Sequence, residues 1–210
     1  MSNTKFVVFE GIDGCGKGTA IKFSLDYLEK KGIGCDSVRD PGSTRVSEAI
    51  REVLLNPKYT EICREAELLL YVAARAQLLA EEIEPRLNSG RHVLCDRYDL
   101  STLTYQYVFG DWEDETPIET TTQVFIGQRK SPDYYILLDT PVDIAKKRVG
   151  KEKDRQESKG DDLFEKVRQR YLMYAEKFDN VIVVDSSGSI DDMNNQIAKV
   201  LDKIFMEEEN

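Results

Sequence analysis

Residues 6–19 of the chain read FVVFEGIDGCGKGT, and this stretch decides the fold. An apolar run predicts a strand, and a glycine-rich turn, a lysine and a predicted helix follow it. Gly11, Gly14 and Gly16 permit backbone angles that other residues avoid, so successive N–H groups can point into one concavity. Lys17 adds a full positive charge, and the helix adds its positive N-terminal end. The pattern predicts a loop that binds phosphate groups.

One position departs from the usual G-x-x-x-x-G-K-[ST] motif. Gly18 follows the lysine, and the hydroxyl comes one residue later, at Thr19. The alternative is an ordinary strand-to-helix turn that happens to be rich in glycine. The flanking strand and helix favour the phosphate loop, because the motif requires that context.

The composition limits the class of protein. The chain has 210 residues, 40% of them hydrophobic, and a formal net charge of -10, which predicts one domain with a sizeable core. An acidic balance argues against a nucleic-acid partner, but an acidic protein can still hold a basic nucleotide pocket. The first residues lack the apolar core of a signal peptide, and no apolar run approaches membrane-spanning length. We therefore expect a cytoplasmic protein with no membrane partner.

Cysteine and histidine add no metal or redox motif. The four cysteines are widely spaced and none forms a Cys-x-x-Cys pair, so free thiols are expected. Cys15, in the glycine loop, is expected to be accessible and sensitive to oxidation. The single histidine, His92, is expected at the surface, which leaves no histidine for catalysis.

Short apolar runs alternate with helical patterns along the chain. Several of the runs are apolar at consecutive positions, as in strands that are buried on both faces. Strands are predicted at 5–9, 34–39, 91–95, 134–138 and 181–184. Helices are predicted at 17–31, 44–56, 61–87, 99–109, 117–129, 142–148, 161–178 and 190–207. The alternation predicts a parallel α/β sheet that is covered on both sides, with ligands at the carboxyl ends of its strands.

Two of these strand ends carry candidate site residues. Asp96 and Arg97 follow the third strand, where a carboxylate can hold magnesium through water. The alternative is an Asp–Arg pair with no catalytic duty. Arg39 ends the second strand and can grip a phosphate with its planar fork, although a capped turn with an exposed arginine would look the same.

Two further clusters come from helices and a connection. Tyr71 and Arg75 lie four apart on one helical face, where they could stack on a base and hydrogen-bond it. The alternative is a core tyrosine beside a surface arginine. Residues 148–155 form a basic island between two helices, and this island fits either a mobile lid over a polyphosphate or an ordinary charged connection.

Taken together, these residues resemble thymidylate kinases, within the nucleoside-monophosphate kinase group. The likeness runs in order through residues 9–17, 39–44, 67–77, 96–106 and 154–155, and it ends at 184–187. It implies one domain over 1–210: a three-layer α/β/α P-loop kinase with a five-stranded parallel sheet and a short mobile lid at about 148–160. It also implies a homodimer, formed through long helices such as 61–87.

The resemblance implies transfer of the γ-phosphoryl group of ATP to dTMP, which gives dTDP and ADP, with Mg2+. The implied catalytic residues are Lys17, Arg97, and a lid arginine, with Arg155 first and Arg148 second. ATP would be bound by Gly11, Asp13, Gly14, Cys15, Gly16, Lys17, Gly18, Thr19, Arg148 and Lys151. The acceptor nucleotide would be bound by Asp13, Arg39, Tyr71, Arg75, Arg97, Ser101, Thr102, Tyr105 and Gln106. Magnesium would be held near Asp96, Thr19 and Asp13.

Several departures from the family pattern leave alternatives open. Gly18 removes the usual magnesium-binding hydroxyl, Asp40 stands where glutamate is usual, and Tyr71 stands where phenylalanine is common. The acceptor could therefore be another deoxynucleotide, such as dUMP or a modified pyrimidine. A protein of a different class, a non-catalytic nucleotide-binding regulator, would keep the loop but would not need all of Lys17, Asp96, Arg97 and the lid arginines.

Overall fold

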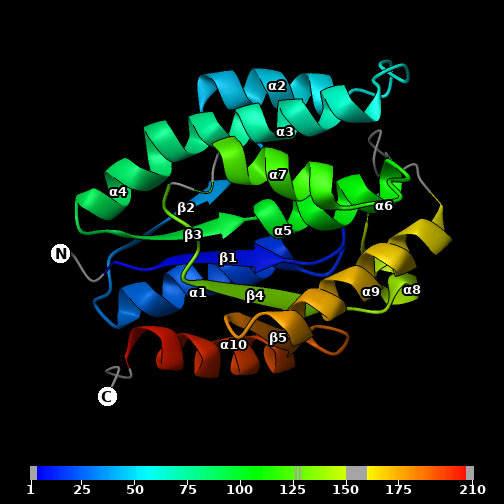
Figure 1. Cartoon of the computed structure of the whole chain (residues 1–210). Coiled ribbons are helices and arrows are strands. Elements are labelled where there is room, and N and C mark those ends of the chain that lie inside the picture. Colours follow the sequence, from blue (N-terminus) through cyan, green and yellow to red (C-terminus); the bar gives the residue numbers. More distant parts are fainter. Residues whose placement is uncertain (1–3, 126, 128, 150–159, 207–210) are drawn as a thin grey trace.

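A computed structural model describes residues 4–125, 127, 129–149 and 160–206. Its centre is a five-stranded sheet in the order β2-β3-β1-β4-β5, with every neighbouring pair parallel (Figure 1). The strands are β1 Phe6–Glu10, β2 Cys35–Arg39, β3 His92–Asp96, β4 Tyr134–Asp139 and β5 Val181–Asp185. All five predicted strands are present, and their ends lie within one residue of the prediction.

β1 is the central strand, and all five of its residues are buried. Val8 pairs with Cys95 of β3 on one side and with Tyr135 of β4 on the other. A strand that is covered on both faces must be apolar at consecutive positions, which explains its sequence. The loop after β1 therefore lies at the middle of the carboxyl edge of the sheet, where α/β proteins bind their ligands.

Helices connect the strands. They are α1 Lys17–Lys30, α2 Arg45–Leu55, α3 Arg64–Leu78, η1 Leu79–Ile83, α4 Glu84–Asn88, α5 Asp99–Ser101, η2 Thr102–Gln106, α6 Tyr107–Phe109, α7 Thr116–Phe125, α8 Val142–Arg148, α9 Asp161–Lys177 and α10 Ile190–Phe205. η1 and η2 are π-helical. Among the described residues, none of these helices is long and apolar enough to cross a bilayer.

The helices form two layers around the sheet. α1 and α10 pack together and contact the strands on one face, while α3, η2 and α9 belong to the other (Figure 1). α2 packs on α3, and α7 contacts both α3 and η2. The expected three-layer α/β/α architecture is confirmed.

Two predicted helices differ from the prediction in their interior. The helix predicted at 61–87 is α3, η1 and α4 in succession, and the helix predicted at 99–109 is α5, η2 and α6. Apolar spacing marks a helical face but cannot show where one extra residue widens a turn, so both π-turns were missed. Helix ends follow local capping: Thr44 accepts a hydrogen bond of 3.0 Å from the Ser47 N–H, so α2 begins one residue later than predicted.

The expectations for His92 and Cys15 are wrong. His92 is half-buried, its Nδ1 accepts a 2.8 Å hydrogen bond from the Lys5 N–H, and its ring meets Phe205 edge-on. Cys15 is fully buried, and burial raises the pKa of its thiol, so it is neither accessible nor activated. All four cysteines are free thiols, as expected.

Candidate active site

The glycine-rich turn forms a tight loop between β1 and α1. Gly11, Gly14 and Gly16 all have left-handed backbone angles, with φ values of 137°, 82° and 105°. At Gly11 a Cβ atom would lie 2.6 Å from the backbone oxygen of Leu138, so only glycine fits there. Gly16 is the N-cap of α1, which points the N-terminal end of that helix into the loop.

Lys17, the first residue of α1, folds its side chain back over this loop. Its Nζ donates to the backbone oxygens of Gly11 and Ile12, at 3.1 and 3.2 Å. The side chain is buried, and its Nζ also lies 3.8 Å from the Cys15 sulfur; among the described residues it forms no ion pair with a carboxylate. The ammonium charge therefore remains available to an anion in the loop.

A cavity of about 550 Å³ opens beside the phosphate loop. Most of the residues that line this cavity are site residues that were predicted from the sequence. The proposed residues on its wall are Asp13, Gly14, Cys15, Gly16, Lys17, Gly18, Thr19, Arg39, Asp96, Arg97 and Arg148. Asp40, Arg51, Ser186, Gly188, Ser189, Ile190 and Met193 complete the lining. Gly11 lies at the base of the loop and is not part of this wall.

A second, smaller cavity of about 80 Å³ lies against the first. It contains every residue proposed for the acceptor nucleotide except Arg39. Its lining is Asp13, Asp40, Pro41, Arg51, Leu55, Tyr71, Arg75, Arg97, Ser101, Thr102, Tyr105 and Gln106. Asp13, Asp40, Arg51 and Arg97 line both cavities, so the two spaces meet at a boundary of two carboxylates and two guanidinium groups.

Asp13 and Arg97 form an ion pair at this boundary. Nη2 of Arg97 lies 2.5 Å from Oδ1 of Asp13, and Nη1 donates to the Gly11 oxygen at 3.0 Å. Burial alone would raise the pKa of Asp13, but the charges of Arg97 and Lys17 lower it below its usual value. The carboxylate is thus ionised at the mouth of the phosphate loop.

Arg39 and Arg51 bring two further positive charges to the same region. Arg39 is paired with Glu48, with Nη2 2.8 Å from Oε1. Arg51, on α2, donates from Nη1 to the Pro41 oxygen at 3.0 Å. Burial lowers the pKa of Arg51, and the nearby charges of Arg39 and Arg97 lower it further.

Arg51 was missed from sequence. A usable signal existed, because Ser47, Arg51 and Leu54 lie at i, i+4 and i+7, and Ser47 and Leu54 are buried. An arginine on the inward face of an amphipathic helix is a candidate for a buried charge site.

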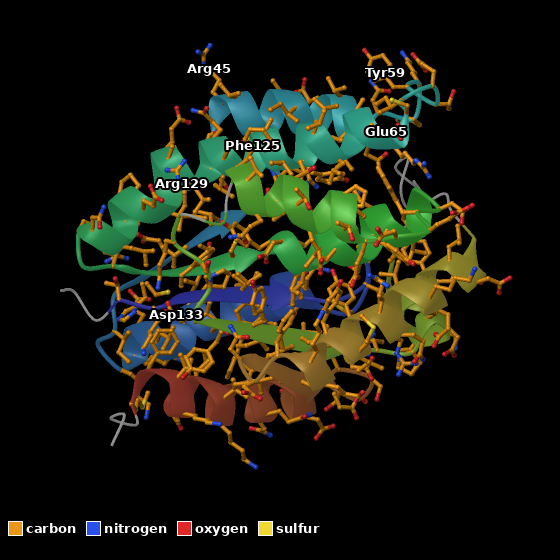
Figure 2. All side chains as sticks on the ribbon, in the orientation of Figure 1. Arg45, Tyr59, Glu65, Phe125, Arg129 and Asp133 are labelled. Carbon is orange, nitrogen blue, oxygen red and sulfur yellow. The ribbon has the colours of Figure 1, made fainter. Side chains whose placement is uncertain are left out.

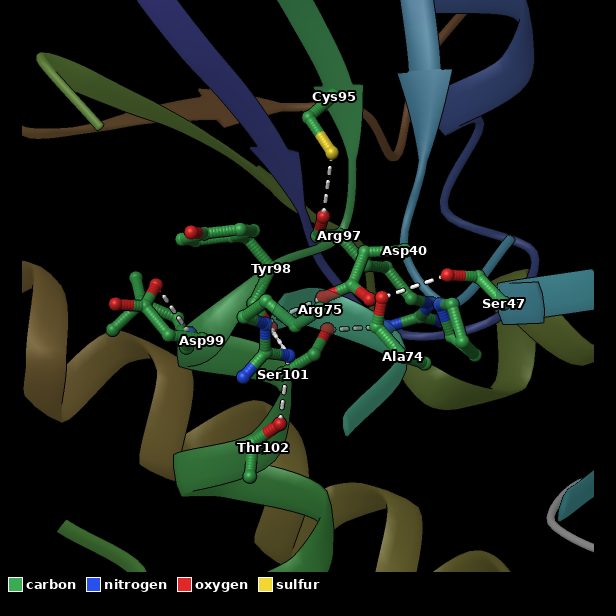
Figure 3. A network of polar contacts seen from close by, with 12 residues as sticks. Asp40, Ser47, Ala74, Arg75, Cys95, Arg97, Tyr98, Asp99, Ser101 and Thr102 are labelled. Carbon is green, nitrogen blue, oxygen red and sulfur yellow. Dashed lines mark hydrogen bonds and ion pairs between the residues drawn. The ribbon is translucent and has the colours of Figure 1, made fainter. Parts of the chain in front are cut away.

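For Tyr71 and Arg75, the alternative of a core tyrosine beside a surface arginine is wrong. Arg75 is 1% exposed, while Tyr71 is half-buried. Arg75 donates from Nε to Oδ2 of Asp40 at 2.6 Å, and from Nη2 to the Tyr98 oxygen and to Oγ1 of Thr102, both at 2.8 Å (Figure 3). Both Tyr71 and Arg75 line the smaller cavity.

The η2 turn supplies the opposite wall. The hydroxyl of Tyr105 lies 3.3 Å from Nη2 of Arg97 and 3.4 Å from Oδ2 of Asp13. Nε2 of Gln106 donates to Oε1 of the buried Glu67 at 3.2 Å. Thr102 faces Arg75, and the π-helical turn brings all these side chains to one cavity.

Glu10 supports the site from below, and sequence reasoning gave it no role. It is fully buried, and Oε1 accepts from the Tyr98 and Ser101 N–H groups at 2.9 and 3.2 Å. Its Oε2 accepts from the Ser101 hydroxyl at 2.6 Å and from the Tyr171 hydroxyl at 2.9 Å. Burial raises the pKa of this carboxyl despite these bonds. An acid inside an otherwise apolar central strand was the available signal.

The residues proposed for a metal are only partly arranged as a site. Oδ1 of Asp96 is buried and lacks a hydrogen-bond partner among the described residues, and Asp96 lines the larger cavity. Thr19 is exposed on the wall of that cavity, and Asp13 is engaged by Arg97. No group of three or more His, Cys, Asp or Glu side chains suited to a metal occurs in the described part of the chain. An oxygen donor set of this size fits Mg2+, which keeps most of its waters.

Of the proposed lid residues, Arg155 and Lys151 lie outside the described residues. Arg148, at the end of α8, donates from Nη1 to the Ser186 oxygen at 2.8 Å and from Nη2 to the oxygens of Ser187 and Gly188, both at 3.2 Å. It therefore holds the loop after β5 against the larger cavity.

Comparison with known proteins agrees with this geometry. The family described as thymidylate kinase matches residues 9–197. A thymidylate kinase of Fervidobacterium nodosum is 38% identical over 196 residues, covering 93% of this chain and 97% of its own. Those of Ligilactobacillus salivarius and Neisseria gonorrhoeae are 37% and 39% identical, covering 96% of this chain and 99% and 98% of their own.

The family match and the relatives each cover nearly the whole chain. They confirm the expected class of enzyme, an ATP-dependent nucleoside-monophosphate kinase, and they agree with the phosphate loop and the two adjoining cavities. The chain belongs to the thymidylate kinase family.

Proposed function

We propose that this protein transfers the γ-phosphoryl group of ATP to dTMP and releases dTDP and ADP. The observation that carries the proposal is the pair of adjoining cavities. One is built on the phosphate loop, the other holds an aromatic ring and a buried arginine, and Asp13, Asp40, Arg51 and Arg97 line both. Such a boundary suits direct transfer between two bound nucleotides.

In this proposal the larger cavity takes ATP. Lys17 and the N–H groups of residues 11–19 cradle the β- and γ-phosphates, and Thr19 lies close to them. The adenine ring lies against the loop at 186–189, where Ile190 and Met193 offer apolar contact and Arg148 fixes the backbone.

The smaller cavity takes dTMP. Tyr71 stacks on the thymine ring, Arg75 donates to its carbonyl edge, and Ser101, Thr102 and Gln106 border it. Tyr105 fills the space that a ribose 2′-hydroxyl would need, which favours a deoxyribose. Arg51 and Arg97, at the boundary between the cavities, and Arg39, on the wall of the larger cavity, meet the acceptor phosphate.

The chemistry needs alignment and charge neutralisation more than proton transfer. The acceptor is already a phosphate dianion, so no strong general base is required. This agrees with the position of the half-buried His92, which begins β3 at the end of the strand away from the site. Arg97 and Lys17 neutralise charge on the moving group, and Asp13 holds the Arg97 fork in place.

Mg2+ would be held by Asp96, through water, with Thr19 and Asp13 near it. When bound, the ion supplies positive charge to the phosphate oxygens and orients them. We propose that Arg155 of the lid at about 148–160 adds the remaining charge, assisted by Arg148 and Lys151. The lid and the single-domain organisation over 1–210 stay predictions, as does the cytoplasmic location.

We also propose a homodimer. Exposed apolar side chains gather on α2, α3 and α7, three helices of which α3 contacts both others. Phe125, 58% exposed, lies on the last turn of α7 (Figure 2). Leu69, 52% exposed, lies on α3. Val46, Val53 and Val124 are exposed on the same helices. Burying such side chains favours association.

The test is ADP formation by purified protein with Mg-ATP and each of dTMP, dUMP, ribosyl TMP, dCMP, dGMP and dAMP. Preference for dTMP over dUMP and over the ribose form is expected. Turnover on another deoxynucleotide would keep the mechanism and replace the acceptor. ATP binding without turnover would instead favour a non-catalytic nucleotide-binding regulator.

A further inference from the structure

We propose that Asp40 is a positioning residue for base selection: it fixes the guanidinium of Arg75 so that one nitrogen, Nη1, is presented to the ring of the acceptor. This inference rests on the proposed function, because it assumes a pyrimidine in the smaller cavity. Neither the phosphate loop nor the catalytic charges include Asp40, and the chain carries aspartate where the resemblance leads one to expect glutamate.

The protein itself uses three of the five N–H donors of Arg75. Nε is taken by Oδ2 of Asp40, and Nη2 is taken by the Tyr98 oxygen and Oγ1 of Thr102 (Figure 3). The Tyr98 ring also lies under the guanidinium, 4.9 Å from its carbon to the ring centroid. A planar fork that is held at two of its three nitrogens cannot rotate, so the direction of the third is fixed.

Nη1 is the nitrogen that remains. It is buried and has no hydrogen-bond partner within the described part of the chain, and Arg75 lines the smaller cavity. Leaving a buried charged donor unsatisfied is costly, so this site favours a ligand that offers an acceptor there. Arginine has no acceptor of its own. Nη1 therefore donates to the O4 carbonyl of thymine or uracil and disfavours the amino group that cytosine carries at the same position.

Asp40 is suited to hold the fork because it is charged and fully buried. Its side chain is 0% exposed, and the 2.6 Å bond to Nε is charge-assisted. It also follows Arg39 directly in the chain, at the end of β2, and it lines both cavities. Asp40, which orients the base-binding Arg75, is thus the immediate neighbour in the chain of Arg39, a residue proposed to bind the acceptor phosphate.

The experiment is steady-state kinetics of Asp40→Asn with dTMP, dUMP and dCMP. Asparagine keeps an acceptor for Nε but removes the charge. We expect KM for dTMP to rise about 10- to 100-fold, the size of one charged hydrogen bond. The preference for dTMP over dCMP should fall about tenfold or more, while KM for ATP changes less than about twofold.

Asp99→Asn is the matched control. Asp99 is a second carboxylate whose charge acts on Arg75, but its Oδ1 accepts from the Tyr135 hydroxyl at 2.7 Å and it does not touch the guanidinium. Removing it tests the loss of a nearby negative charge without loosening the fork. Its base preference should stay within about twofold of the wild type.

Asp40→Glu restores the charge on a side chain that is one methylene longer. Its base preference should lie between those of the wild type and Asp40→Asn, and it decides the question alone if Asp40→Asn does not fold. Wild-type preference in the Asp40 variants, or an equal loss in Asp99→Asn, would overturn the inference. A wild-type enzyme that does not prefer dTMP to dCMP would instead refute the proposed function.

Discussion

The hydroxyl of Tyr171 on α9 donates to Oε2 of Glu10 at the end of β1, across 2.9 Å. The same hydroxyl lies 2.8 Å from Oγ of Ser101, the last residue of α5. Three segments far apart in the chain therefore meet at one buried carboxylate beneath the two cavities. Since α9 follows the proposed lid in the chain, this contact joins the helix after the lid to the floor of the site.

Tyr171→Phe removes this link with little change in shape. Glu10 keeps the Ser101 hydroxyl and two backbone N–H groups, so the free energy of unfolding should fall by about 1–2 kcal/mol. We expect kcat to fall as well, because Ser101 and Arg97 both contact the Tyr171 hydroxyl and lose that shared partner. Tyr174→Phe is the control, since Tyr174 lies on the same helix as Tyr171 but its hydroxyl donates to Glu115, the residue before α7, and not to Glu10. Equal losses of kcat in both variants would contradict the link.

Lys17→Ala should lower the rate of phosphoryl transfer about 100-fold or more, because it deletes a positive charge aimed at the transferred group. ADP formation at saturating Mg-ATP measures the loss. Lys22→Ala removes an exposed lysine from the same helix and should leave the rate unchanged. Unchanged turnover in Lys17→Ala would refute the phosphate-loop assignment.

Gly18 is a position where a hydroxyl can be restored. A Cβ atom there meets no atom within 4 Å, and the residue lies in the first turn of α1. Gly18→Ser and Gly18→Ala should each stabilise the helix by about 0.5–1 kcal/mol. Serine alone adds a magnesium ligand, so the Mg2+ concentration for half-maximal activity should fall in Gly18→Ser and not in Gly18→Ala. An identical Mg2+ response in the two variants would place the metal away from this turn.

His92 predicts a pH dependence of stability. Burial, with a smaller effect of Lys5, lowers its pKa below the ordinary 6.5, so the unfolded chain binds a proton more readily than the folded one. The stabilisation is complete above pH 6.5 and is lost as the pH falls through the folded-state value. Urea unfolding at pH 8 and 5.5 measures this loss.

His92→Asn is the control for that measurement, because its amide oxygen can accept from the Lys5 N–H without titrating. Other titrating groups contribute in both proteins, so the difference between them isolates the histidine. A pH dependence of the same size in His92→Asn would assign the effect to other groups.

Leu69→Glu should convert the proposed dimer to a monomer, since it places a charge on the exposed apolar face of α3. Sedimentation velocity at micromolar concentration reports the change. Met173→Glu alters another exposed apolar residue, on α9 and outside the group on α2, α3 and α7, and should leave the mass unchanged. A wild-type monomer would rule out the dimer itself.

The sequence predicted the sheet because buried parallel strands must be apolar at consecutive positions, as in β1. It predicted the phosphate loop because the glycines that must adopt a positive φ there stand at the fixed spacing of the motif, at positions 11, 14 and 16. It could not predict that Arg75 is buried and Tyr71 half-exposed, because spacing gives a shared face but not the depth of that face. Glu10 and Arg51 were missed for a related reason: each acts through a partner from a distant segment, namely Tyr171 and the Pro41 oxygen.

The π-helical turn η2 has a consequence for how this site can change over time. Residues 104–106 are buried at three consecutive positions, which a regular helix on a surface does not allow. A deletion of one residue within 102–106 would restore ordinary winding and turn each later side chain by about 100° relative to Thr102. Tyr105 and Gln106 would leave the wall together. The site should therefore tolerate substitution at these positions better than any change in their number.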